Sequence, residues 1–146
     1  MGPVDEILTE VDCGDGKKAI LGREGENLYF CTMQRTKGIF WRRVGAEYFT
    51  RAYLEEYEQI ILANYYWESD FLSGICREPG AKEISFQLVD EEENFLMEGK
   101  LPVREDGIFY GANIRGEASD EVAYPYHLRA LDAEGNVIAG EVEGVL

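Results

Sequence analysis

The chain has 146 residues, of which 29 are acidic and 14 are basic, so its formal net charge is −15. A hydrophobic fraction of 45% and an aromatic fraction of 12% exclude the apolar poverty of a disordered chain, so we expect a folded protein. The acidity argues against nucleic acid as a partner, because phosphate binding needs clustered Lys and Arg. Residues 1–81 carry a net charge of −5 and residues 82–146 carry −10.

Residues 1–57 predict a three-strand antiparallel β-meander with a short helical linker. Turn residues near Gly14 and Gly25 separate strands that we expect at residues 18–23, 27–36 and 38–44. The last two strands are joined near Gly38, since glycine accepts the positive φ of a tight hairpin. Between residues 46 and 58 the aromatic spacing partly fits a helix, and Thr50 can cap a turn that begins near Arg51.

Residues 58–146 contain seven runs rich in β-branched or aromatic residues, separated by turn signals. The runs are residues 59–67, 71–77, 82–89, 94–101, 107–115, 121–131 and 136–142. Ile84, Phe86 and Leu88 alternate with polar residues, which predicts one buried and one wet face. Pro125 predicts an edge strand or a bulge, and Gly135 a left-handed hairpin residue. Altogether the sequence predicts an all-β chain, in which residues 58–146 form a seven-strand immunoglobulin-like β-sandwich.

An aromatic group closes the first of these runs and is our first candidate binding surface. Strand alternation places Tyr65 and Trp67 on one face and Tyr66 on the other. Exposed Trp and Tyr side chains can stack on sugars or anchor a protein partner. The alternative is that these rings pack between the helical linker and the sandwich.

The second candidate surface is a basic cluster on the predicted hairpin of residues 27–44. It consists of Arg35, Lys37, Arg42 and Arg43, with Trp41 among them. The overall acidity makes a nucleic-acid partner unfavourable here too. We therefore expect the hairpin to meet an acidic surface of the same molecule, of a second copy or of a partner.

Little in the sequence indicates catalysis, and we predict no enzyme, no cofactor and no metal site. His127 is the only histidine, so a small hydrolase would have to pair it with a nucleophile such as Cys76. The acidic turn at residues 90–93 lacks the spacing of a calcium loop. Three cysteines, Cys13, Cys31 and Cys76, indicate buried free thiols, although a bridge from Cys13 to Cys31 stays open for an oxidising compartment.

Several segments resemble small uncharacterised β-rich proteins of Gram-positive bacteria, many of which are tethered outside the cell. The resemblance rests on residues 67–70, 72–75, 79–84 and 126–138, and it covers about the last 90 residues. It implies a β-sandwich and carries no activity, catalytic residue or cofactor. This chain departs from the pattern in showing no tether.

These observations lead to a functional hypothesis with one alternative. We expect a non-catalytic interaction or structural module whose ligand is unknown, with a protein partner or self-association. The alternative is an acidic inhibitor or immunity-type protein that occupies a basic site on a partner. The first residues form neither a signal peptide nor a membrane span. From the resemblance we expect an extracytoplasmic location, with a cytoplasmic one as the alternative.

Overall fold

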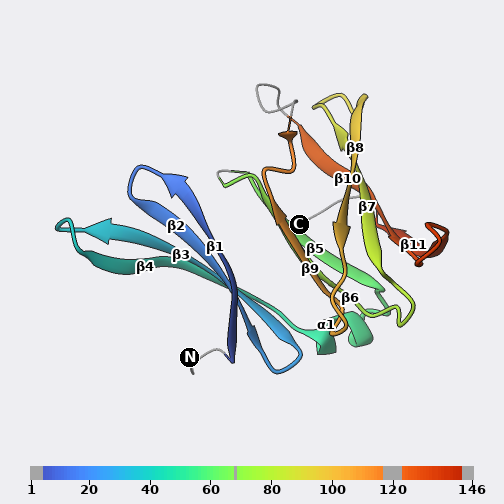
Figure 1. The fold of residues 1–146 in the computed structure, drawn as a ribbon, viewed down its shortest axis with the longest axis horizontal. Helices are drawn as coiled ribbons and strands as arrows, with labels where there is room; N and C mark the ends of the chain where they lie inside the picture. The colour runs from blue at the N-terminus through green and yellow to red at the C-terminus, as the bar shows by residue number, and fades with distance from the viewer. Residues whose placement is uncertain (1–4, 68, 117–122, 143–146) are drawn as a thin grey trace. The chain divides into compact units, whose positions relative to one another are not determined.

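The computed structural model describes residues 5–67, 69–116 and 123–142, and it is an all-β fold with one short helix (Figure 1). The chain divides into two compact units, Met1–Tyr53 and Leu54–Leu146, which we call unit 1 and unit 2. The division predicted from the sequence lay between residues 57 and 58. Each unit is described by itself below.

Unit 1 is a four-stranded antiparallel sheet in the order β1-β2-β3-β4. Its strands are β1 (Glu6–Gly14), β2 (Lys17–Glu24), β3 (Asn27–Thr36) and β4 (Phe40–Phe49). The prediction of three strands is therefore wrong, because it omitted β1. Polar Glu10 and Asp12 alternate with Val11 and Cys13 in β1, and this period of two was the signal that could have identified it.

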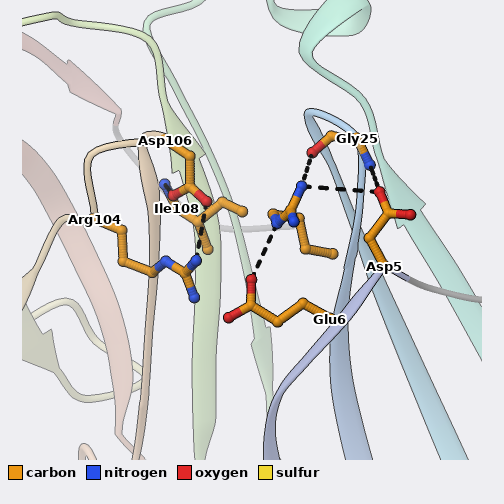
Figure 2. A network of polar contacts seen from close by, with 7 residues as sticks. Asp5, Glu6, Gly25, Arg104, Asp106 and Ile108 are labelled. Atoms are coloured by element: carbon orange, nitrogen blue, oxygen red, sulfur yellow. Dashed lines mark hydrogen bonds and ion pairs between the residues drawn. The ribbon is translucent and has the colours of Figure 1, made fainter.

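Tight turns and one ionic network hold the strands of unit 1 in register. Lys37 and Gly38 have φ values of 48° and 80° between β3 and β4, which confirms the predicted hairpin. At the opposite end of the sheet, Arg23 binds the carboxylates of Asp5 and Glu6, and its Nη1 donates to the carbonyl oxygen of Gly25 (Figure 2). This network fixes the start of β1 against the β2–β3 turn.

Helix α1 is shorter than the helical segment predicted between residues 46 and 58. It spans Arg51–Glu56, and residues 46–49 belong to β4 instead. Thr50 caps the helix as predicted, since its Oγ1 accepts a hydrogen bond of 3.2 Å from the backbone N–H of Tyr53. Leu54 is the fully buried side chain of the helix.

Unit 2 contains seven strands in two antiparallel sheets, and each strand falls within or close to one of the predicted runs. The strands are β5 (Ile61–Tyr66), β6 (Phe71–Cys76), β7 (Glu83–Val89), β8 (Phe95–Pro102), β9 (Ile108–Ala112), β10 (Tyr124–Leu131) and β11 (Val137–Val142). One sheet has the order β5-β6-β9 and the other has the order β11-β10-β7-β8. The fifth run was predicted too long, because β9 ends at Ala112 and a turn follows in which Asn113 has a φ of 55°.

Side chains from both sheets of unit 2 form one hydrophobic core. Leu72 and Phe109 come from the three-stranded sheet, while Ile84 and Leu128 come from the four-stranded sheet, and all four are fully buried. The predicted burial of Ile84, Phe86 and Leu88 is confirmed. The expectation of a wet opposite face is wrong at Ser85, which is only 6% exposed.

Pro125 lies in β10, which is an inner strand between β11 and β7. The prediction of an edge strand or a bulge is confirmed by a bulge, and among the described residues the ladder with β11 covers only Leu128 to Leu131. The register with β7 shifts between Tyr126 and Arg129, and His127 has a φ of 50°. The proline is accommodated because it lies outside the ladder with β11 and because the bulge interrupts the ladder with β7 just after it.

Two hairpin loops of unit 2 share one hydrogen-bonding design. Asp90 and Asp132 each accept a backbone N–H bond from the asparagine four residues later, Asn94 and Asn136, at 2.9 Å and 2.8 Å. These bonds are the largest cause that lowers the pKa of both carboxyl groups. The predicted left-handed Gly135 is confirmed by its φ of 84°.

Candidate functional site

The aromatic rings at the end of β5 lie as strand alternation predicted. Tyr65 and Trp67 contact each other edge to face, with ring centroids 6.3 Å apart. Tyr66 instead contacts the ring of Phe71 on its neighbouring strand, at 6.5 Å. Trp67 is 39% exposed, so part of its indole reaches the surface.

Trp67 is the centre of a mixed aromatic and ionic group that we call the Trp67 cluster. Its members are Tyr65, Trp67, Asp70, Arg115 and Tyr124. The guanidinium carbon of Arg115 lies 4.0 Å from the centroid of the indole ring. The ring of Tyr124, itself 40% exposed, lies 5.4 Å from the indole with the two planes 35° apart. A cation and a second ring therefore fix the exposed indole.

Asp70 connects the members of the cluster beneath the surface. Its Oδ1 accepts a bond of 2.7 Å from the Tyr65 hydroxyl, and its carboxylate accepts the backbone N–H of Arg115 at 3.2 Å to Oδ2. The Nε of Arg115 lies 3.2 Å from Oδ1. The side chains of Asp70 and Arg115 are only 13% and 15% exposed. The pair is therefore partly desolvated, and its hydrogen bonds hold the aromatic rings in one arrangement.

The same contacts perturb the acidity of Tyr65. Burial is the main cause that raises the pKa of its phenol well above the ordinary value, and the hydrogen bond to Asp70 adds to it. Tyr65 therefore stays protonated as a donor at any physiological pH.

Sequence reasoning named Tyr65 and Trp67 but missed Asp70, Arg115 and Tyr124. These three come from a turn after β5, a turn after β9 and the start of β10. Asp70 has a φ of 48°, so its position depends on a tight turn that directs the carboxylate at Arg115. Nothing local in the sequence marks Tyr124, because it lies 57 residues beyond Trp67.

The basic cluster lies on the β3–β4 hairpin of unit 1, as predicted. Arg35 pairs with Trp41 across the two strands, Lys37 lies in the turn, and Arg42 and Arg43 follow on β4. The Nη1 of Arg43 donates to the Tyr29 hydroxyl at 3.4 Å.

The structure adds cations from β2 to this hairpin. The Nζ of Lys18 lies 4.5 Å from the centroid of the Trp41 ring and 3.7 Å from Oε2 of Glu10. Lys17, Lys18, Arg35 and Trp41 line an open concavity of about 500 Å³, together with Glu10 and Asp12 of β1. Both acidic and basic side chains line it, so the concavity has no single charge preference.

The two residues considered for a catalytic pair, Cys76 and His127, pack against other side chains of unit 2. The side chain of Cys76 is 2% exposed within the core of unit 2, which disfavours attack on a substrate. His127 packs edge to face against Tyr126, with ring centroids 4.3 Å apart. Among the described residues, no group of three His, Cys, Asp or Glu side chains is placed to hold a metal.

None of the three cysteines forms a disulfide in the structure. Cys13 lies on β1 and Cys31 on β3, and β2 separates these strands. Two strand spacings amount to about 9.5 Å, while the Cα atoms of a disulfide lie at most about 7 Å apart. The alternative of a Cys13–Cys31 bridge is therefore wrong for this fold.

No helix in the described part of the chain is long and apolar enough to cross a membrane. Comparisons of this chain with protein-family models, with curated proteins and with solved structures found no match.

Proposed function

We propose that the protein is a non-catalytic interaction module that binds a protein partner through the Trp67 cluster. The observation that carries this proposal is the fixed, exposed pair of rings, Trp67 and Tyr124, supported by Arg115. Trp, Tyr and Arg are the residue types most enriched among the energetic hot spots of protein interfaces. A preorganised group of them loses little conformational entropy on binding, which favours affinity.

A protein partner fits this group better than a sugar does. A sugar ring that stacks on an indole needs an open ring face, and Arg115 already lies over the Trp67 ring. The neighbouring Tyr124 ring is tilted by 35°, so the two rings form no flat platform. A protein side chain can instead fill the angle between them.

The strand orders of unit 2 support an immunoglobulin-like sandwich. Its first, second and fifth strands form one sheet, and its seventh, sixth, third and fourth strands form the other. The constant-type immunoglobulin arrangement differs only in placing the fourth strand beside the fifth. Such scaffolds host recognition at loops and strand ends, which is where the Trp67 cluster lies. The resemblance to tethered Gram-positive proteins stays a prediction and favours a location outside the cytoplasm.

The test compares retention of proteins from the producing organism on immobilised wild-type chain and on two tryptophan variants. Trp67→Ala should abolish retention of a partner that persists in 0.5 M salt, because truncation of a hot-spot residue costs about 2 kcal/mol or more. Trp41→Ala is the matched control in unit 1 and should leave retention unchanged. A partner retained equally by wild type and Trp67→Ala would contradict the proposal.

The charge distribution favours one alternative function. Unit 1 contains eight acidic and eight basic residues and is neutral, whereas unit 2 contains 21 acidic and six basic residues, so it carries the whole charge of −15. An acidic inhibitor that occupies a basic site on its partner would use this charge.

Polylysine serves as the probe for this alternative. An inhibitor that acts through charge should have a partner that competes with polylysine and dissociates as salt rises, because exposed charges are screened. Binding through the Trp67 cluster should tolerate both treatments. The two functions are thereby distinguished in one titration.

A further inference from the structure

The two edges of the unit 1 sheet carry opposite charge. Within the described residues, β1 and β4 each have one strand neighbour in the sheet order β1-β2-β3-β4. The sequence of β1 contains Glu6, Glu10 and Asp12 and no basic residue. The sequence of β4 contains Arg42 and Arg43 with one acidic residue. One sheet therefore offers an acidic strand at one edge and a basic strand at the other.

The β4 edge is long and exposed. It is ten residues long, it contains no proline, and every residue from Phe40 to Ala46 is exposed. Phe40 and Val44 are 61% and 48% exposed, and Ile39 in the preceding turn is 74% exposed. A long, exposed and apolar edge strand is a template for pairing with another chain.

The regular parts of the two edges match in length. In β1 the register shifts between Ile7 and Thr9 and again after Asp12, so residues 9–12 form an uninterrupted ladder with β2. In β4 the register shifts between the residues that pair with Thr32 and Met33 of β3. Residues 40–43 therefore form the corresponding regular stretch with β3. Each edge therefore presents about one short strand of regular backbone, bounded by a bulge.

Glu10, Asp12 and Arg43 on the two stretches share one face of the sheet, while Arg42 lies on the other face. Lys18 lies over Trp41 and contacts Glu10, and it pairs with Asp12 in the ladder, which places these residues on the same face. Arg43 is two residues beyond Trp41 and so shares that face too. In an antiparallel pair directly opposite residues share a face, so Glu10 of one copy can lie opposite Arg43 of the next.

Pairing of two β4 edges or of two β1 edges would be less favourable than pairing of β1 with β4. Two β4 strands bring four arginines to one junction, and two β1 strands bring only acidic charges. Like charges opposite one another across a ladder are destabilising. The strand directions also fit a contact between β1 and β4. Neighbouring strands of the unit 1 sheet are antiparallel, so β1 and β4 run in opposite directions, and a second copy that is shifted without rotation places its β1 antiparallel to β4 of the first.

We propose that β1 of one copy of this chain pairs with β4 of a second copy, so that the unit 1 sheet continues from molecule to molecule. The contact is heterologous, since each copy uses a different edge for its two neighbours. It therefore extends into open assemblies and does not stop at a symmetric dimer. This self-association does not involve the Trp67 cluster.

Sedimentation analysis of the full chain over a range of concentrations tests the proposal. Wild type should rise above the monomer mass of 16.6 kDa as concentration increases, and the rise should weaken with salt. Arg42→Glu with Arg43→Glu should weaken association by about tenfold or more. Glu10→Lys with Asp12→Lys should do the same. Glu10→Gln with Asp12→Asn keeps the side-chain acceptor for Gly14 N–H and should show an intermediate effect.

Mixing the two charge-reversed variants provides the decisive arm. The β4 variant has two acidic edges and the β1 variant has two basic edges, so neither should associate alone, whereas their mixture should associate because acidic and basic edges alternate again. Circular dichroism confirms that each variant is folded, and Trp67→Ala should assemble like wild type. A wild type that remains monomeric up to about 1 mM, or a mixture that forms no dimer, would overturn the proposal.

Discussion

Unit 1 and unit 2 arrange their strands differently. Unit 2 joins two sheets over one shared core, and its fully buried side chains come from both sheets. Unit 1 is a single sheet, and β4 exposes apolar side chains at Phe40, Trp41 and Val44. The charge follows the same division, since unit 1 is neutral and unit 2 carries −15. Apolar residues therefore stabilise unit 2 internally, whereas in the outer strand of unit 1 they remain available for contacts.

The two tryptophans allow this contrast to be measured unit by unit. Trp41 lies in unit 1 and Trp67 in unit 2, and the chain has no other tryptophan. In Trp41→Phe protein the fluorescence reports on unit 2, and in Trp67→Phe protein it reports on unit 1. Urea unfolding of these backgrounds gives a free energy of unfolding for each unit.

The largest expected effect is the loss of a core side chain in unit 2. Leu72→Ala removes a fully buried side chain and should lower the free energy of unfolding of unit 2 by about 2 to 5 kcal/mol. Val44→Ala on the exposed β4 strand is the matched truncation in unit 1 and should change stability by less than about 0.5 kcal/mol. Equal effects would contradict the contrast between the two units.

A smaller effect should come from adding one methyl group at a strand glycine. A Cβ at Gly74 in β6 would clash with the carbonyl oxygen of Leu62 and lie 2.5 Å from Cζ of Phe109. Gly74→Ala should therefore lower the free energy of unfolding by about 1 to 3 kcal/mol. Gly45→Ala in β4 meets no atom within 4 Å and should leave stability unchanged or slightly higher. A loss of stability at Gly45 would show that β4 is packed more closely than its exposure indicates.

Two tyrosine–carboxylate bonds sharpen the comparison further. Tyr65 donates to Asp70 in unit 2 at 2.7 Å, and Tyr48 donates to Glu24 in unit 1 at 2.9 Å. At neutral pH, Tyr65→Phe should cost about 1 kcal/mol of unfolding free energy, because a partly buried carboxylate loses a donor. Tyr48→Phe removes a solvent-exposed bond and should have a much smaller effect.

Alkaline pH gives an independent measurement of Tyr65. Its pKa is raised in the folded state, so above about pH 10 the unfolded chain loses the phenol proton while the folded chain retains it. The stability of unit 2 should therefore fall as pH rises through this range. The fall should be shallower in Tyr65→Phe, and an identical pH profile would show that the phenol is not held protonated.

The smallest expected effect concerns the acidic loops of unit 2. The pKa values of Asp90 and Asp132 are lowered in the folded state, mainly by backbone hydrogen bonds from Asn94 and Asn136. Their contribution to stability is present above about pH 4 and is lost as pH falls through the lowered values. Asp132→Asn should make the acid unfolding of unit 2 less steep, as followed by Trp67 fluorescence. An unchanged acid profile would contradict this role for the loop.

The fold class and most strand positions could be predicted because they depend on local patterns. Alternating apolar residues, as in β7, and turn residues such as Gly38 and Gly135 act through neighbours in the chain. The same reasoning identified the Thr50 cap and placed Tyr65 and Trp67 on one face. It failed at β1, where acidic residues at the alternate positions obscured a strand of modest hydrophobicity.

The sequence by itself determined an acidic, all-β chain with one aromatic and one basic candidate surface, because composition and periodicity are local properties. Only the tertiary structure decided what surrounds each candidate. Arg115 and Tyr124 reach Trp67 through turns and strand pairings between distant segments, and Lys18 reaches Trp41 across β3. The difference in net charge between unit 1 and unit 2 likewise depends on the tertiary contacts that define the two units. Local sequence patterns do not show which distant segments pair, because pairing depends on the topology of the whole fold.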